Sequence, residues 1–465
     1  MFILMPVIFV LGILAIALED KIKINKAAIA LFMAISLWMI LMFDAYDIFV
    51  ERSSPLFQEF LTQNPEMANA PLKDQFITFI TNRSIVYHLG NVSETLFFVM
   101  CSMLIVDIVD KHGGFRAVTG YIRTANKRKL LWYISFAAFF FSALLDNLAA
   151  AIVIMAVLRK LVPDRTDRLK YACMVIIAAN AGGSWSPIGD VTTILLWVGK
   201  NVTAMHQISH VFFPALINLL VPLTIANFWL FKKDATLRVM SEEEMADEYA
   251  PEIPNHSRRV IFVIGVLSLA LVPVFQMVTD LPPFLGVLLG LVVLWFYTDI
   301  MYSKLHMHES NKLRISQLLP NIDLATIFFF LGILMAVGAL ETSGQLGLMS
   351  AFLDKHVHEP YLISVLSSCV DNVALVAATM GMYPIVPDAA NLTPYAQFFV
   401  SDGGFWTFLA YCAVTGGSIL IIGSATGVTV MGLEKIDFMY YTKRFSILAL
   451  IGYCCGAGVY MLLFA

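Results

Sequence analysis

Apolar stretches long enough to cross a lipid bilayer dominate this chain and decide what it can fold into. Of 465 residues, 59% are hydrophobic and 14% are charged, whereas soluble domains carry roughly 25% charged residues. A helix of about 17 to 25 apolar residues crosses the hydrocarbon layer. Because a spanning helix satisfies its own backbone hydrogen bonds, the sequence predicts an all-α, multi-pass membrane protein. The candidate spans are 2–18, 27–43, 93–109, 171–198, 211–231, 260–278, 283–298, 324–340, 405–433 and 445–465.

Charge and cysteine content argue against several other classes of protein. The net charge of −4, from 30 basic and 34 acidic residues, predicts no basic surface for nucleic acid. The six cysteines lie in apolar stretches without metal-ligand spacing, so we expect buried thiols rather than disulfides.

The run 2–18 has no basic region before it and no cleavage site after it, which favours a retained span. We expect no bound cofactor, and a bacterial inner membrane as the location.

Basic residues place the loops on the two sides of the membrane. Lys21, Lys23 and Lys26 put the first turn in the cytoplasm and the N-terminus outside. The loop 44–90 is then external, and its acidic bias agrees. The segment 232–259 combines basic residues with an acidic run, and we expect a cytoplasmic linker there. The remaining spans leave the C-terminus outside.

Two apolar stretches have both flanks on one side of the membrane and cannot be single crossings. Residues 130–160 lie between two basic loops, which predicts a re-entrant hairpin with its tip at Asp146-Asn147. At ~1.5 Å per residue, each arm reaches about 20 Å. Residues 360–384 hold Asp371-Asn372 at their middle and predict a second hairpin, which enters from outside.

Three matched blocks in the same order indicate an internal repeat. Thr95-Leu-Phe-Phe resembles Thr326-Ile-Phe-Phe, and the two hairpin tips correspond. Gly182-Gly183-Ser184 with Gly189-Asp190 matches Gly416-Gly417-Ser418 with Gly423-Ser424. Each half, 1–231 and 260–465, then has five spans and one hairpin, and an odd number of spans inverts the second half. Inverted repeats are typical of secondary transporters.

Each half also contains a span that a continuous helix cannot form. The segments 180–193 and 415–427 hold clustered glycines. Broken helices at membrane depth line cavities or are buried in protein, and their free carbonyls and nearby hydroxyls coordinate hard cations. Close helix packing is the alternative explanation of a Gly-Gly pair. The oxygen-bearing candidates in these segments are Asn180, Ser184, Asp190, Thr192, Thr193, Ser418, Ser424 and Thr426.

Acidic residues at membrane depth are costly, so each is a functional candidate. Asp146, Asp190 and Asp371 lie in stretches that contain no Lys or Arg. Carboxylates without a fixed cation beside them predict a cation as the ligand.

Three further residues are candidates for proton coupling, each with a simpler alternative. Glu94 could instead be a helix acid stabilised by the helix dipole. Asp323 could simply cap the span that follows it. An unperturbed histidine titrates near neutrality, which makes His88 a candidate; an ordinary histidine of the external loop is the alternative.

These motifs resemble those of NhaD-type sodium/proton antiporters of the ion transporter superfamily, which also contains arsenite permeases and sodium-coupled dicarboxylate carriers. The resemblance covers roughly residues 85–465. It is carried by Leu145-Asp-Asn-Leu-Ala-Ala-Ala, by the stretch 179–193 and by Cys369-Val-Asp-Asn-Val-Ala. The carboxylate carriers have Ser-Asn-Thr at the hairpin tips, where this chain has Asp146-Asn147-Leu148 and Asp371-Asn372-Val373.

The resemblance implies exchange of Na⁺, with Li⁺ as a second cargo, for H⁺ in a homodimer with scaffold and transport domains. An anion or oxyanion carrier of the same superfamily is the alternative function, which the acidic lining disfavours. A membrane enzyme is a third, but no His-Glu-x-x-His or Gly-x-Ser-x-Gly motif occurs. The resemblance assigns one half of the cation site to Asp146, Asn147, Asp190, Thr192 and Thr193, and the other to Asp371, Asn372, Ser418, Ser424 and Thr426.

Overall fold

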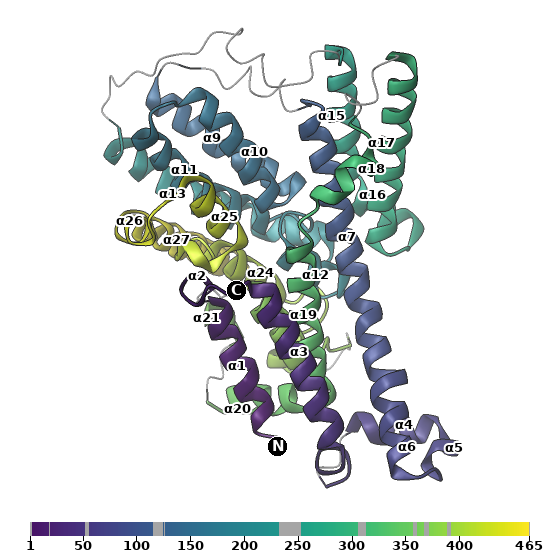
Figure 1. The fold of residues 1–465 in the computed structure, drawn as a ribbon. Helices are drawn as coiled ribbons and strands as arrows, with labels where there is room; N and C mark the ends of the chain where they lie inside the picture. The colour runs from purple at the N-terminus through teal and green to yellow at the C-terminus, as the bar shows by residue number, and fades with distance from the viewer. Residues whose placement is uncertain are drawn as a thin grey trace. The chain divides into compact units, whose positions relative to one another are not determined.

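Helices build the part of the chain that the computed structural model describes, as its apolar stretches require (Figure 1). Within that part lie seven helices long and apolar enough to span a membrane, or eight when one bent pair counts as a span. No strand element occurs in the same residues. The predicted all-α, multi-pass fold is therefore confirmed. The described residues are 2–17, 19–51, 55–114, 124, 126–231, 253–305, 313–356, 360–366, 372–387 and 392–464.

The chain divides into two compact units, each of which takes segments from both halves of the sequence. Unit 1 comprises Met1–Phe97, Asp323–Ile363 and Val373–Val386. Unit 2 comprises Phe98–Ile322, Ser364–Asn372 and Pro387–Ala465. The predicted halves are thus related stretches of sequence that do not coincide with the compact units.

Unit 1 is organised around the close packing of α3 (Lys26–Phe43) against α19 (Leu324–Thr342) (Figure 1). Gly332 permits the approach, because a Cβ there would lie 2.5 Å from the backbone carbon of Ala30. The indole nitrogen of Trp38 donates to the carbonyl of Met335 at 2.9 Å, which adds a polar tie between the two helices. This unit also contains α1 (Leu4–Ala17), α2 (Glu19–Ile22), α20 (Gln345–His356), most of α22 (Asn372–Met382) and the helices between α3 and Phe97.

The predicted outer loop 44–90 is helical in most of its described residues. A continuous helix of 40 residues runs over Leu72–Lys111 and ends as α7 (Val86–Lys111). At ~1.5 Å per residue it is about 60 Å long, twice the hydrocarbon thickness, so part of it lies outside the lipid. Phenylalanines hold its outer portion to the preceding helices: ring centroids of Phe49 and Phe57 lie 5.1 and 5.3 Å from that of Phe79. The preceding helices are η1 (Asp47–Glu51), α4 (Pro55–Gln63) and α5 (Pro65–Ala68), while α6 (Leu72–Ile77) and η2 (Thr78–Ile85) form the first part of the long helix itself.

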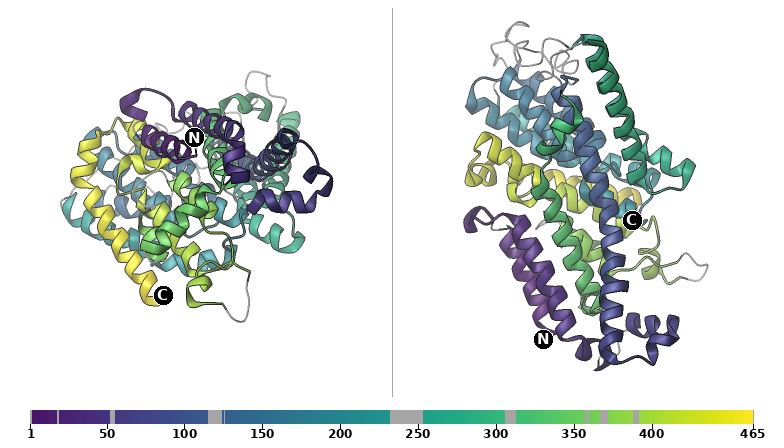
Figure 2. Two further views of the ribbon diagram at one scale, coloured as in Figure 1. Left: turned by 90° about the horizontal axis from the view of Figure 1, so that it is seen from below. Right: turned by 45° about the vertical axis from the view of Figure 1, so that its right-hand side comes forward.

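Unit 2 contains both broken spans and the first hairpin. In Figure 2 the blue and teal helices of this unit lie beside its yellow ones, and α13 packs closely on α27. The helices before the linker are α9 (Lys127–Leu145), α10 (Asn147–Leu161), α11 (Arg165–Ser184), α12 (Val191–Val198) and α13 (Ala204–Trp229). Those after it are α15 (Asn255–Ala270), α16 (Val272–Thr279), α17 (Pro283–Leu305), α18 (Ile315–Leu318), η4 (Leu319–Asn321), α23 (Pro394–Gln397), α24 (Gly404–Gly416), η6 (Ile421–Gly423), α25 (Ala425–Glu434), α26 (Phe438–Arg444) and α27 (Ser446–Phe464).

The predicted breaks occur, with shifted boundaries. Hairpin 130–160 is the pair α9 and α10, interrupted at Asp146 as expected. The first broken span is interrupted later than its glycines suggested, because α11 continues through Gly182 and Gly183 to Ser184. Close packing explains Gly182, whose Cβ would lie 2.0 Å from the carbonyl oxygen of Phe139. The second broken span is formed by α24 and α25.

One bend was not predicted, and several predictions lie outside the described residues. Span 260–278 is the pair α15 and α16, bent by 47°. Pro273, in the first turn of α16, cannot donate the backbone hydrogen bond that a straight helix needs there. The linker over 232–252 and the tip residue Asp371 are outside the described residues, and the second hairpin is represented by α21 (Pro360–Leu366) and α22.

The two broken spans share local geometry, as the matched blocks of sequence suggested. A Cβ on Gly189 would lie 2.7 Å from the carbonyl oxygen of Gly183, and one on Gly423 would lie 3.2 Å from that of Gly417. Each short helix is then capped by a polar residue with extended backbone, Asp190 for α12 and Ser424 for α25. The inversion of the second half stays a prediction.

Candidate functional site

The tip of the first hairpin presents a buried carboxylate in a constrained backbone conformation. Asp146 has φ +86°, in a region that residues with a Cβ seldom occupy, and its side chain is 8% exposed. Its Oδ1 accepts from the backbone N–H of Leu148 at 2.6 Å and of Ala149 at 3.1 Å, which caps α10. Residues with positive φ cluster at functional sites. Among the hydrogen bonds described, none uses Oδ2, so that oxygen can take a ligand.

Asp190 occupies the centre of a second set of contacts. Its Oδ1 accepts from the backbone N–H of Thr192 at 2.7 Å and from the Thr192 hydroxyl. Its Oδ2 accepts from the side-chain amide of Asn147, and the amide of Asn372 lies 3.5 Å from both oxygens. The side chain is 3% exposed. This carboxylate is therefore the acceptor around which polar groups from three segments gather.

Asn180 joins the first hairpin to the second broken span. Its Oδ1 accepts from the Asn147 amide at 3.0 Å, while its own amide donates to the hydroxyls of Ser418 at 2.9 Å and Ser424 at 3.0 Å. Ser424 Oγ also accepts from the backbone N–H of Gly427 at 3.1 Å. Both lone pairs of this hydroxyl are therefore occupied. Ser424 serves in this arrangement as a cap rather than as a free cation ligand.

The remaining residues of the predicted site have different surroundings. The Thr193 hydroxyl contacts the backbone of Asp190, and the Ser184 hydroxyl donates to the carbonyl of Ala181 at 2.8 Å. Both hydroxyls thus form hydrogen bonds within their own segment. Thr426 Oγ1 is fully buried and has no hydrogen-bond partner among the described residues. Asp371 lies outside the described residues.

The structure therefore brings together most of the residues that the sequence singled out, all within unit 2. They come from α10, α11, the N-terminus of α12, the first residue of α22, the turn after α24 and the N-terminus of α25. The gathered ligands are carboxylate, amide and hydroxyl oxygens, and hard cations prefer such ligands. Within the described residues, no group of three His, Cys, Asp or Glu side chains is placed to hold a metal ion.

The three proton-coupling candidates belong to unit 1 and not to this cluster. Asp323 is exposed and accepts from the backbone N–H and hydroxyl of Thr326 at 3.2 and 2.6 Å, so it has the capping role considered as its alternative. His88 Nε2 lies 3.1 Å from the Thr342 hydroxyl on α19. Glu94 is half-buried on α7. Their part in proton coupling stays a prediction.

Gln207 is a residue of this region that the sequence analysis missed. It lies on α13, is fully buried, and donates from Nε2 to the carbonyl oxygen of Ser184 at 2.5 Å. This bond braces the last turn of α11, where the first broken span stops being helical. Gln207 stands beside the polar residues His206, Ser209 and His210, just before the apolar span 211–231, so no sequence signal singled it out.

Comparison with known proteins gives one family and several relatives. A family model described as citrate transporter, CitMHS, matches residues 7–401. Sodium/proton antiporter 1 of Arabidopsis thaliana is 39% identical over 98% of this chain and 72% of the relative. Sodium/proton antiporter 2 of the same plant is 36% identical over 98% of both chains. The Na(+)/H(+) antiporter NhaD of Vibrio cholerae is 28% identical over 83% of this chain and 81% of the relative.

Proposed function

The chain belongs to the citrate transporter (CitMHS) family, and from this we propose that it is a secondary transporter that exchanges Na⁺ for H⁺. Relatives that cover nearly the whole chain carry the name sodium/proton antiporter. The resemblance that the motifs of the sequence indicated is thus confirmed at the level of family and relatives. Multiple membrane-spanning helices agree with a transporter.

The observation that carries the proposal is the buried set of oxygen ligands around Asp146 and Asp190. Both carboxylates lie in unit 2 and are less than a tenth exposed. The stretch 171–199, which supplies Asp190 and Asn180, contains no Lys or Arg. Buried acids without a fixed cation need a mobile one or a proton, and those are the two ions to be exchanged.

We assign different roles to the two acids from their hydrogen bonds. Asp190 accepts from Asn147 and Thr192 with its two oxygens, so we assign it to holding these groups of the site in place. Asp146 uses Oδ1 to cap α10. Its other oxygen can then hold Na⁺ or, after the ion has left, a proton. Because one carboxylate cannot hold both at once, binding of either ion excludes the other and exchange follows.

Citrate is the second candidate cargo, since the family's description names it. A citrate site needs basic side chains or several donors for its carboxylates. Asp146 and Asp190 would instead repel an anion at the described cluster. The geometry therefore favours the cation.

Several finer features are part of the proposal. Li⁺ is a second cargo because the ligands are hard oxygens, and no cofactor is needed because the exchange breaks no covalent bond. The site lies within unit 2, and we assign unit 2 to the transport domain and unit 1 to the scaffold of a homodimer. We place the protein in a bacterial inner membrane with both termini outside.

Proteoliposomes that enclose a pH-sensitive dye test the function directly. Adding NaCl or LiCl outside should alkalinise the lumen, because inward movement of Na⁺ or Li⁺ drives H⁺ outward, whereas KCl and sodium-free citrate should have no effect. A citrate-dependent signal that persists without Na⁺ would contradict the cation assignment and support an anion carrier.

A further inference from the structure

Three helices of unit 2 have one end at the candidate site and the other end at a single ionic cluster. At the site, α10 supplies Asn147, α11 supplies Asn180, and α25 is capped by Ser424. Hydrogen bonds join Asn147 to Asn180 at 3.0 Å and Asn180 to Ser424 at 3.0 Å. The same three helices are therefore tied to one another where their polar ends meet.

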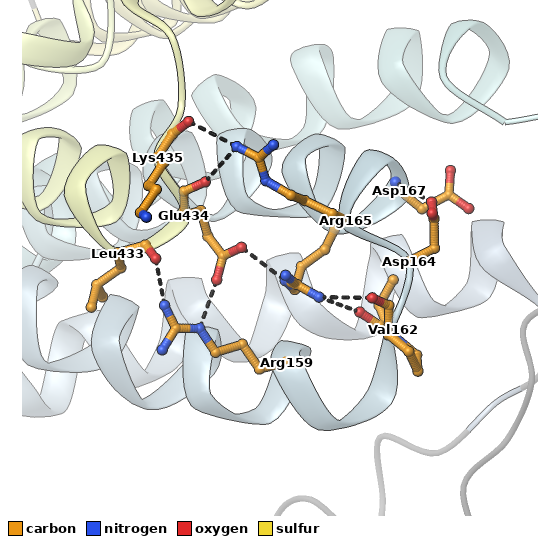
Figure 3. Close-up of polar contacts among 10 residues, drawn as sticks. Arg159, Val162, Asp164, Arg165, Asp167, Leu433, Glu434 and Lys435 are labelled. Carbon is orange, nitrogen blue, oxygen red and sulfur yellow. Dashed lines mark hydrogen bonds and ion pairs between the residues drawn. The ribbon is translucent and has the colours of Figure 1, made fainter.

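The ionic cluster ties the opposite ends of these helices (Figure 3). Glu434, the last residue of α25, accepts from Nε of Arg159 on α10 at 2.7 Å and from Nε of Arg168 on α11 at 2.8 Å. Its side chain is 2% exposed. Arg165 also reaches across and donates to the backbone carbonyl of Lys435 at 3.1 Å. We call Glu434, Arg159 and Arg168 the Glu434 cluster.

The distances between the two ties are similar in all three helices. Asn147 to Arg159, Arg168 to Asn180 and Ser424 to Glu434 are each separated by about ten to twelve residues, or roughly 15–18 Å of helix. Three stiff segments of matched length, joined at both ends, form a braced frame. A shift of α25 along α10 or α11 would have to break the bonds at both of its ends.

The Glu434 cluster persists throughout the physiological pH range. Burial raises the pKa of Glu434, but the hydrogen bonds and charges of Arg159 and Arg168 outweigh burial and hold the pKa below its usual value. The carboxylate is thus charged at every pH where exchange is expected, and the brace does not depend on the proton gradient.

We propose that Glu434 is a positioning residue for the cation site: it fixes α25, and with it Ser424 and Thr426, relative to Asn147 and Asn180. The inference rests on the proposed function and adds a residue that touches neither ion. The loss of this positioning should affect Thr426 most directly. Its buried hydroxyl has no partner among the described residues, and it lies two positions past Ser424, the cap of α25. Loosening α25 moves this hydroxyl away from the other oxygens.

The test compares Glu434→Gln with Asp167→Asn in the same preparation. Glu434→Gln keeps the size of the side chain and removes the charge that holds both arginines. Arg159 keeps its bond to the carbonyl of Leu433 at 2.5 Å and Arg168 keeps its bond to that of Val162 at 2.9 Å, so we expect the variant to fold.

Asp167 is the matched control. It too is an acid held by two basic side chains, Lys127 and Lys170, at the same end of α11. Burial raises the pKa of Asp167, but hydrogen bonds from these lysines lower it below the usual value, so Asp167 is likewise charged. Its ion pair with Lys127 joins α11 to α9, its ion pair with Lys170 lies within α11, and neither includes α25.

Two readouts separate positioning from general stability. In proteoliposomes at pH 8.5, Glu434→Gln should raise the Na⁺ concentration for half-maximal exchange by roughly three- to tenfold with little change in maximal rate, the usual range for remote coupling. The Na⁺-dependent rise in melting temperature of the detergent-purified variant should shrink in parallel. Asp167→Asn should leave both near the wild-type values.

Each outcome decides a separate question. Wild-type Na⁺ affinity in Glu434→Gln, or an equal loss in Asp167→Asn, overturns the positioning role. If Glu434→Gln fails to accumulate, Arg159→Gln replaces it, because that side chain is 45% exposed and its loss removes one tie of the same cluster. Absence of Na⁺-dependent exchange in the wild type would instead count against the proposed function, and the melting shift with Na⁺ would still report on binding.

Discussion

The amide of Asn180 donates to the hydroxyl of Ser424 at 3.0 Å, although 244 residues separate the two positions in the chain. The bond joins the two broken spans, one from each half of the sequence. Asn180 also accepts from Asn147, so a single amide side chain coordinates three segments of the site.

Asn180→Ala should abolish or strongly reduce Na⁺-dependent proton flux while the protein still reaches the membrane. The substitution leaves Ser418 and Ser424 without their common donor and removes one of the two acceptors of the Asn147 amide. Asn218→Ala is the control, since Asn218 is another buried asparagine of unit 2, on α13. Equal loss in both variants would indicate a general packing defect.

Asp146→Asn, Asp190→Asn and Asp371→Asn should each abolish or severely weaken exchange, because each keeps side-chain volume and removes a charge. The mode of failure should differ between the first two. Asp146→Asn removes the exchangeable carboxylate, so Na⁺ should no longer raise the melting temperature. Asp190→Asn puts an amide where the donors of Asn147 and Thr192 need carboxylate oxygens. This variant should therefore also have a lower melting temperature when measured in the absence of Na⁺. Full exchange in all three variants would place the site elsewhere.

Competition predicts how Na⁺ affinity depends on pH. Protons compete with Na⁺ for the same carboxylates, so the apparent Na⁺ affinity should tighten as pH rises and then level off. The measurement is half-maximal Na⁺ concentration from pH 6 to 10 in proteoliposomes. Glu94→Gln should leave the curve unchanged if Glu94 is structural and shift it if Glu94 carries a proton. A flat curve with exchange present would require a separate proton carrier.

His112 should make unit 2 less stable in acid. Burial lowers the pKa of His112 to about 4 from the usual 6.5. Its Nδ1 lies 2.7 Å from the carbonyl of Ile108 and its Nε2 lies 2.6 Å from the hydroxyl of Tyr302, an arrangement that suits the neutral ring. Because the unfolded chain takes up the proton first, the stability that the neutral ring contributes is present above pH 6.5. It is lost as the pH falls towards 4, by at most about 3 kcal/mol.

Melting curves of the detergent-purified protein between pH 7 and 4.5 test this expectation. His112→Gln should flatten part of the pH dependence, since glutamine does not titrate. His256→Gln is the control because His256 is an exposed histidine of the same unit. An unchanged slope in His112→Gln would assign the acid sensitivity to other groups.

The sequence predicted the spans and the site better than it predicted the ties between them. The sequence located the break between α9 and α10 at Asp146, whereas the re-entrant course of this pair in the membrane stays a prediction. The repeat pointed to Asp190 and Ser424, and both cap short helices with the same extended backbone. Such features depend on local pattern, which a single sequence contains.

Contacts between distant segments could not be found in this way. In the sequence, Glu434 is an acidic residue at the end of an apolar stretch, and nothing near it in the chain indicates a partner. The fold brings it into contact with Arg159 and Arg168. The helical character of the outer segment was also missed, since its core of Phe49, Phe57 and Phe79 depends on tertiary packing. For Gly182 the sequence predicted a break that the structure does not have. This glycine allows α11 to pack closely against Phe139 and does not end the helix.

The brace between the Glu434 cluster and the site bears on the affinities that the two faces of the membrane present. If the ligands keep one geometry whichever face they open to, the intrinsic dissociation constants for Na⁺ and H⁺ are equal on both sides, and the kinetics of exchange are symmetric. The ion gradients set the direction of net flux, as in any exchanger, so the same molecule works as an extruder in one condition and, at similar rates, as a loader in another.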